Sequence, residues 1–221
     1  MPLVASFFLH EADNVINLEK LALAQQAIVD AGKQLHAAGQ VPATAGNFSV
    51  RLDESHMAIT VSGCHKGHLS VADVMVTDFA LAPVGSTLKP SDEAHLHGQL
   101  YEDAPLAGAI LHGHSKAATL LSLLEPGDTL WLTGYELQKA LEDVTSHEAR
   151  IAVPIFDNTQ DIAALADTVR QRLAEQDCCA YLIRGHGFYT WAQDMQTCLR
   201  HVEALEFMFD CELELRRGLS S

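Results

Sequence analysis

The stretch Ala109-Ile110-Leu111-His112-Gly113-His114-Ser115 sets the outline of both the fold and its site. Its apolar residues predict a buried strand over 108–112, and Ser115 predicts the start of a helix over 115–124. In an extended chain, residues i and i+2 project from the same face, so the imidazoles of His112 and His114 can reach one ion. The glycine between them removes a side chain that would crowd such a site.

His186 is the third candidate ligand. It lies between Gly185 and Gly187 after a predicted strand over 180–183, where the backbone can turn sharply and bring the ring close to another element. Three histidines that leave a fourth position open are typical of a catalytic zinc site rather than a structural one. The plainer interpretation is that His112 and His114 are ordinary polar residues at a strand end. The glycines and His186 favour the metal site.

Nine further histidines bring the total to twelve. His95 and His97 fall in a predicted helix, where residues two apart point to opposite sides, so they cannot share one ion. His65 and His68 are loop residues, either plain polar groups or groups near the mouth of the site. The remaining histidines have no function that their spacing indicates.

Helices and strands alternate along the whole chain, which favours an α/β sheet covered on both faces over a helical bundle or a β-sandwich. The predicted helices are 18–38, 92–101, 115–124, 135–141, 161–175 and 195–216. The predicted strands are 48–52, 57–61, 108–112, 129–133, 151–155, 180–183 and 188–191, with further short strands and turns before Pro90. A polar arm over 1–16 precedes one domain over 17–221.

Charge excludes several classes of partner. The 221 residues include 14 basic and 29 acidic side chains, a net charge of −15. Such an excess repels nucleic acid and acidic membrane surfaces. No apolar run approaches the roughly 18 residues that span a bilayer, and no secretory signal is expected. The five cysteines show no CxxC spacing, which indicates reduced thiols and a cytoplasmic protein.

Two glycine-containing turns are candidates for holding an anion. They contain Gly46 and Asn47 in the first and Ser62, Gly63 and Lys66 in the second. Exposed N–H groups, small hydroxyls and one lysine are the donors that a phosphate needs. Each turn alone is equally consistent with ordinary turn chemistry. Ser91, ahead of a predicted helix, is a third polar candidate.

Two carboxylates are candidate acid/base groups. Glu93 follows Ser91 closely, and Glu136 follows Gly134 at a predicted helix start. Most acidic residues in so acidic a chain are simply solvated, so geometry has to decide between these two.

In this order, five segments resemble the class II aldolase family of zinc-dependent sugar-phosphate enzymes. They are Gly46-Asn47-Phe48-Ser49, Ser62-Gly63-Cys64-His65-Lys66-Gly67, Lys89-Pro90-Ser91-Asp92-Glu93, His112-Gly113-His114-Ser115 and Arg184-Gly185-His186-Gly187. The resemblance implies a single catalytic domain with a three-layer α/β/α fold and a mixed, largely antiparallel sheet. It also implies a homotetramer, a phosphorylated sugar substrate and one zinc ion on His112, His114 and His186.

Three further segments are most similar to a dehydratase branch of that family, which acts on a methylthio-substituted ketose phosphate in methionine salvage. They are Gly134-Tyr135-Glu136-Leu137, Val153-Pro154-Ile155-Phe156-Asp157-Asn158-Thr159 and His186-Gly187-Phe188-Tyr189-Thr190-Trp191. In that branch Glu136 is the expected acid/base, whereas in the aldolase branch it is Glu93.

The alternatives are an aldolase or epimerase on a phosphorylated ketose or pentose, and a non-catalytic interaction domain, which loss of the metal histidines would mark. One departure concerns Asp92, which stands where the family often has a small hydroxyl residue in the phosphate pocket. A carboxylate beside a phosphate is unfavourable unless it points away, so Asp92 is not a predicted phosphate ligand.

Overall fold

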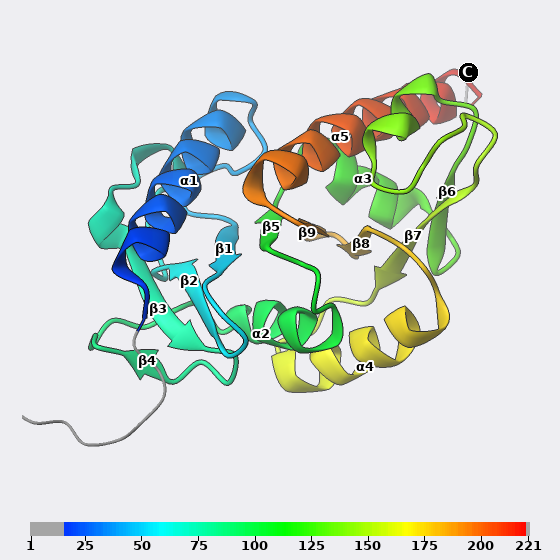
Figure 1. Ribbon diagram of the computed structural model, residues 1–221. Coiled ribbons are helices and arrows are strands. Elements are labelled where there is room, and N and C mark those ends of the chain that lie inside the picture. Colours follow the sequence, from blue (N-terminus) through cyan, green and yellow to red (C-terminus); the bar gives the residue numbers. More distant parts are fainter. Residues whose placement is uncertain (1–15, 220–221) are drawn as a thin grey trace, which may run out of the picture.

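The computed structural model describes residues 16–219, which form a nine-stranded sheet between helices (Figure 1). The strands are β1 (Asn47–Arg51), β2 (His56–Thr60), β3 (Val74–Asp78), β4 (Pro83–Val84), β5 (Ala109–Gly113), β6 (Thr129–Leu132), β7 (Ile151–Phe156), β8 (Ala180–Ile183) and β9 (Gly187–Ala192). Their spatial order is β4-β3-β2-β1-β5-β9-β8-β7-β6. Every neighbouring pair is antiparallel except β7 with β8, which is parallel.

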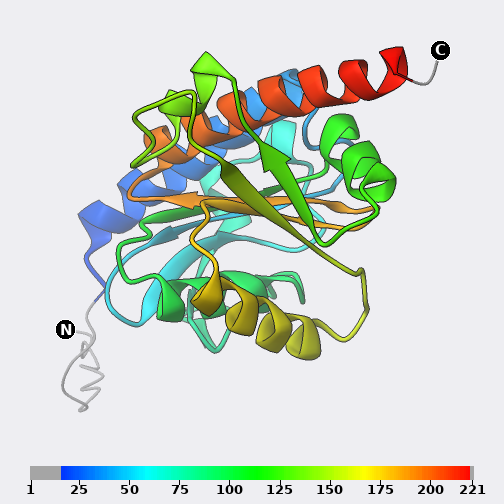
Figure 2. The same ribbon diagram turned by 90° about the vertical axis from the view of Figure 1, so that its right-hand side faces the viewer.

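Helices cover both faces of this sheet (Figures 1 and 2). On one face lie α1 (Leu18–Ala37), α3 (Lys116–Leu124) and α5 (Met195–Gly218), and on the other lie α2 (Ala94–Asp103) and α4 (Ile162–Glu175). The expected three-layer α/β/α fold with a mixed, largely antiparallel sheet is confirmed. Within residues 16–219, no helix has both the length and the apolar character needed to cross a membrane.

The predicted arm over 1–16 lies outside the described residues except for Ile16. The division into an arm and a domain therefore stays a prediction.

Each face of the sheet has its own hydrophobic core because side chains alternate along a strand. In β5, Leu111 packs in the core under α1, α3 and α5, and Ile110 packs in the core under α2 and α4. Phe188 and Tyr189 of β9 divide between the two cores in the same way. Full burial of one such side chain contributes roughly 1.5–3 kcal/mol. The apolar run 109–111 is continuous because β5 has no solvent-exposed face.

Side-chain caps fix the starts of four helices. Asn17, Ser115, Asp161 and Asp194 each accept a hydrogen bond from the backbone N–H three residues later. Such a cap contributes about 1 kcal/mol. Because Ser115 directly follows His114, its cap determines where the chain changes from strand to helix beside the candidate ligands.

Most predicted boundaries agree with the structure within two residues. The segment predicted as a helix over 135–141 is instead a 3-10 helix, Glu136–Ala140. Its buried Gln138 donates to the carbonyls of Ser146 and Ala149, so the segment is tied to the loop that follows rather than extended as an α-helix. Strands β3 and β4 fall in the region before Pro90 for which the sequence predicts short strands and turns without bounds. The pattern does not delimit β3 because it is buried on both faces and shows no alternation, and β4 has only two residues.

Glu206 is a buried acid in the middle of α5. The residue is only 9% exposed, and the Oε1 atom of its side chain has no hydrogen-bond partner. Burial raises the pKa of Glu206 from 4.5 to about 7; a hydrogen bond from Ser115 offsets part of the rise and the charge of Asp210 adds to it.

We expect Glu206→Gln to raise the melting temperature more at pH 8 than at pH 5. The folded state holds this proton more tightly than the unfolded chain, so stability falls as the pH rises from 4.5 to about 7. Removing the ionisable group should increase the free energy of unfolding by on the order of 2 kcal/mol at pH 8. Thermal unfolding at the two pH values measures this, with the exposed Glu203→Gln as control. An equal effect of Glu206→Gln at both pH values would contradict the expectation.

Candidate metal centre

His112 lies near the end of β5, where both neighbouring strands hold it. It pairs with Asn47 in β1 and with Tyr189 in β9. Its Nδ1 lies 2.8 Å from the carbonyl oxygen of Phe188, which can only accept, so Nδ1 carries the proton and donates. The buried ring stacks on Tyr189 with 4.1 Å between centroids. Nε2 of His112 is therefore left with a free lone pair.

His114 lies against His112, as the i, i+2 spacing predicts. The two Nε2 atoms are 2.9 Å apart, and the ring centroids are 4.7 Å apart. The backbone N–H of His114 donates to the carbonyl of Gln40 at 2.8 Å, which holds the chain just beyond the strand. The juxtaposition of the two rings is observed, and metal binding by them stays a prediction.

The hairpin between β8 and β9 carries His186 to the same place. Gly185 adopts a φ of +68°, a conformation that favours glycine. A Cβ on Gly187 would lie 2.1 Å from the carbonyl oxygen of Gly113. Only glycine therefore lets the start of β9 approach the end of β5 this closely.

The ring of His186 completes a triad. Its centroid lies 5.2 Å from that of His112 and 4.5 Å from that of His114. Its Nδ1 lies 3.3 Å from Oδ1 of Asn158, an acceptor, and a hydrogen donated there leaves Nε2 with a lone pair for a cation. Asn158 lies in the segment 153–159 that resembles the dehydratase branch, but local sequence patterns do not predict its contact with His186, because the two residues are 28 positions apart.

Glu93, the residue directly before α2, is the fourth member of the cluster. Its Oε1 lies 3.0 Å from Nε2 of His186, and its Oε2 lies 3.6 Å from Nε2 of His112. Oε2 also accepts a hydrogen bond of 3.1 Å from Nδ2 of Asn47. Of the two candidate carboxylates, Glu93 is thus the one that the fold brings to the histidines.

These four side chains fit a divalent cation. One ligand atom from each of Glu93, His112, His114 and His186 lies within 4.8 Å of the others. Nε2 of His186 is buried and makes no hydrogen bond, although Glu93 lies beside it. A buried nitrogen without a hydrogen is costly unless something accepts its lone pair, and a metal ion does so. The two outer bonds from Nδ1 of His112 and His186 are those that orient histidine ligands elsewhere.

The protonation of the cluster suits the same purpose. Burial holds the pKa of His112 well below its usual value, and burial together with His186 lowers the pKa of His114 to about 4. Both rings are neutral at pH 7, as ligation requires. Burial of Glu93 opposes its ionisation, but the contact with His186 outweighs this, so the pKa of Glu93 lies below its usual value.

A cavity of about 260 Å³ opens beside the cluster. Glu93 and His114 line it together with all six predicted phosphate residues: Gly46, Asn47, Ser62, Gly63, Lys66 and Ser91. The segments carrying Ser62 and Ser91 are held together by the Val61–Pro90 bridge. Asp92 is exposed and does not line the cavity, so its carboxylate leaves room for an anion.

Lys66 is the cation of this cavity. It is 1% exposed, and its Nζ donates to the carbonyls of Thr44 at 3.1 Å and Cys64 at 2.7 Å. These bonds use two of the three ammonium hydrogens and leave the third for a ligand. Burial lowers the pKa of Lys66, and the charge of Glu93 opposes that shift.

Gly46 and Gly63 shape the turns around the cavity. Their φ values are +82° and +76°. A Cβ on Gly46 would lie 2.6 Å from the carbonyl oxygen of His112, so this turn packs directly on the ligand strand. The backbone N–H groups of such turns are available for an anion.

Glu136 does not join the cluster. Its side chain is 75% exposed and lies 2.5 Å from Nζ of Lys139 and 3.8 Å from Nδ1 of His147. Pairing with Lys139 lowers the pKa of Glu136. Its expected role as acid/base stays a prediction.

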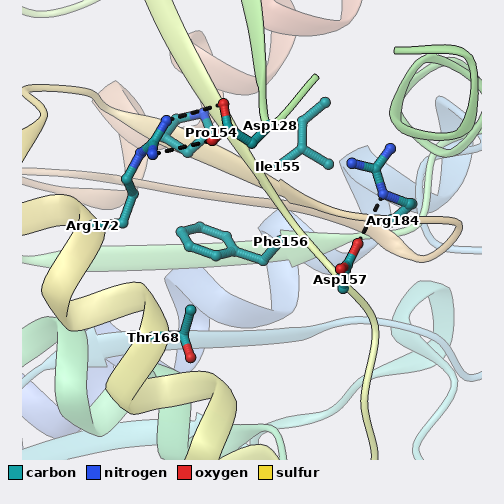
Figure 3. A pocket seen from close by; sticks show the side chains of 8 residues that line it. All are labelled: Asp128, Pro154, Ile155, Phe156, Asp157, Thr168, Arg172 and Arg184. Carbon is teal, nitrogen blue, oxygen red and sulfur yellow. Dashed lines mark hydrogen bonds and ion pairs between the residues drawn. The ribbon is translucent and has the colours of Figure 1, made fainter. Parts of the chain in front are cut away.

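A second cavity, of about 280 Å³, lies between β7 and α4 (Figure 3). Its lining residues are Asp128, Pro154, Ile155, Phe156, Asp157, Thr168, Arg172 and Arg184, none of which is a predicted site residue. Arg184 pairs with Asp157 at 3.0 Å in its wall and also donates to the carbonyls of Ser122, Glu125 and Gly127. These bonds hold Arg184 and Asp157, the residues close to His186 and Asn158 in the sequence. The second cavity therefore lies next to segments that position the candidate metal centre.

The fold and the site define a class of protein, and the sequence comparison agrees. The Class II Aldolase and Adducin N-terminal domain family matches residues 26–213. The chain belongs to this family.

Particular relatives are more informative. The chain is 51% identical over 205 residues to a methylthioribulose-1-phosphate dehydratase of Marinobacter nauticus, across 92% of this chain and 99% of that protein. It is 53% identical over 191 residues to a methylthioribulose-1-phosphate dehydratase of Pseudomonas aeruginosa, across 86% and 93%. Among solved structures, it is similar to an L-fuculose-1-phosphate aldolase from Thermus thermophilus, with a TM-score of 0.73 and 26% identity, across 91% and 99%.

We expect His112→Ala to abolish stoichiometric metal binding, because it removes the ligand whose orientation both neighbouring strands fix. Metal content after dialysis against zinc, measured by plasma mass spectrometry, reads the result. His95→Ala, an exposed histidine on α2, is the control and should keep the metal. An unchanged metal content in His112→Ala would refute the ligand assignment.

Proposed function

We propose that this chain is a zinc-dependent hydro-lyase that converts 5-methylthioribulose 1-phosphate to 5-methylthio-2,3-dioxopentyl phosphate in methionine salvage. The observation that carries the proposal is identity of about half the residues, over nearly the full length of both chains, to methylthioribulose-1-phosphate dehydratases. The cluster of Glu93 with three histidines supports a metal-dependent reaction.

Zinc is the proposed metal because three imidazoles are a common catalytic donor set for that ion. His112, His114 and His186 would hold it, with Glu93 beside it. When bound there, zinc would supply Lewis-acid polarisation of the substrate ketone.

Phosphate binding and proton transfer would fall to the chain's own residues. The phosphate would lie against Lys66, the small hydroxyls of Ser62 and Ser91 and the backbone of the two glycine turns. Glu93, ionised at neutral pH, would accept the proton from C3 of the substrate. With loss of the C4 hydroxyl as water, the resulting enol becomes the 2,3-diketone.

Glu136 is the proposed acid/base on the C4 side. As general acid it has to carry a proton, whereas in one copy of the chain Lys139 keeps it ionised. This role therefore requires that the pair open when the site is assembled. We propose a homotetramer in the cytoplasm, in which a neighbouring copy supplies the exposed Glu136 to the site.

We expect Glu93→Gln and Glu136→Gln each to lower kcat at least a hundredfold. Steady-state kinetics on zinc-loaded tetramers measure this. Mixing the two variants after dissociation should restore part of the activity, because some sites then combine an intact Glu93 with an intact Glu136 from another copy. Full activity of Glu136→Gln would exclude it as acid/base, and no recovery on mixing would contradict its supply by a neighbouring copy.

An aldolase is the second candidate, because the carboxylate found at the histidines is the one that the aldolase branch uses. The fold likeness to an L-fuculose-1-phosphate aldolase points the same way. Breaking the C3–C4 bond and removing water from C3 and C4 both begin from a polarised C2 ketone, so the metal cluster serves either reaction.

The deciding experiment incubates zinc-loaded protein with 5-methylthioribulose 1-phosphate and identifies the product by NMR and mass spectrometry. We expect a diketone phosphate that weighs one water less than the substrate. Two smaller fragments would establish the aldolase. Absence of turnover by a protein with full zinc content would overturn the proposed substrate.

A further inference from the structure

A chain of hydrogen bonds between buried side chains leads from the core under α2 to the metal centre. The hydroxyl of Tyr101 lies 2.9 Å from Oγ of Ser49, which lies 2.7 Å from Nδ1 of His97. Nε2 of His97 lies 2.5 Å from Oδ1 of Asn47, whose Nδ2 donates to Glu93. Tyr101, Ser49, His97 and Asn47 are each at most 2% exposed.

The carboxylate of Glu93 determines which atom donates in each of these hydrogen bonds. An ionised carboxylate only accepts, so the amide nitrogen of Asn47 faces Glu93 and the amide oxygen faces His97. Nε2 of His97 must then carry a hydrogen to donate. Nδ1 is left to accept from Ser49, and Ser49 accepts in turn from Tyr101. In this arrangement each of the four hydrogen bonds has one donor and one acceptor.

The surroundings of His97 keep it neutral. Burial lowers the pKa of His97 to about 3, and the charge of Glu93 opposes this only in part. Tyr189 meets the ring edge to face at 5.6 Å between centroids, and its other contacts include the face of His112. His97 is thus packed against the residue that also supports a candidate ligand.

We propose that His97 is a positioning residue for the reaction: its Nε2–H fixes the amide of Asn47, which in turn holds the Glu93 carboxylate toward the substrate. The inference rests on the proposed function in one respect, that Glu93 acts on a substrate at the metal. The sequence spacing excludes His97 as a partner of His95 at one ion. The proposed positioning role is independent of that exclusion.

Two amide substitutions separate positioning from simple filling of the core. In glutamine the side-chain nitrogen is as many bonds from Cβ as Nε2 of histidine, so His97→Gln can still donate to Asn47. In asparagine the amide matches Nδ1 instead, so His97→Asn keeps a group near Ser49 and loses the donor to Asn47. Both replacements are uncharged amides.

We expect His97→Asn to lower kcat about tenfold to a hundredfold with KM nearly unchanged, the usual size of an effect transmitted through one intermediate residue. His97→Gln should retain kcat within about fivefold of the wild type, on the same scale. Zinc content and melting temperature are measured on both variants. His95→Asn, exposed on the same helix, should match the wild type.

Equal kcat losses in the two variants, a loss that follows zinc content, or full activity of His97→Asn would each overturn the proposal. A measurement on the wild type covers the case in which the variants do not fold. Long-range proton–nitrogen NMR of the zinc-loaded protein at pH 7 should show His97 as the neutral tautomer with the hydrogen on Nε2. A hydrogen on Nδ1 would contradict the proposed direction. Because this readout needs no substrate, it remains decisive if the proposed dehydration itself fails.

Discussion

The site depends on the hydrogen bond from Nδ1 of His112 to the carbonyl of Phe188. This bond crosses from β5 to β9 and uses a backbone acceptor at the end of the sheet ladder. It fixes the tautomer of His112 and points Nε2 at the place where His114 and His186 meet. Because the acceptor belongs to the residue after Gly187, the same short segment carries one candidate ligand, His186, and orients another, His112.

The negative net charge and the anionic substrate that we propose are compatible because the cavity is locally different from the surface. Lys66 is buried there with two carbonyls as partners, and Asp92 is exposed and does not line the cavity. Repulsion between exposed charges falls off within about 10 Å at ordinary ionic strength. A small ligand in a cavity therefore responds mainly to Lys66, the proposed metal ion and nearby N–H groups, whereas a polyanion would meet the whole acidic surface.

The fold and the three histidines could be predicted from local patterns. Alternation along strands, the apolar run before His112 and capping residues such as Ser115 are all short-range signals. The place of Glu93 could not, because its contact with the histidines depends on how α2 packs under the sheet. The same holds for Asn158 and for the bonds of His97, whose partners are 28 to 50 positions away in the sequence. Such contacts depend on the topology of the fold, and the local periodicity of the sequence does not predict them.

The parallel pairing of β7 with β8 also has a consequence for which parts of this chain are constrained in sequence. Since β7 and β8 run in the same direction, with Phe156 opposite Ile183, the loops bearing Asn158 and His186 leave the sheet at the same edge. The crossover through α4 returns the chain to β8, and its inner side, with Leu165 and Val169 buried, packs on the core. The outer surface of α4 is therefore free to change its sequence, and so to acquire new surface properties, without altering the register that sets the ligand geometry.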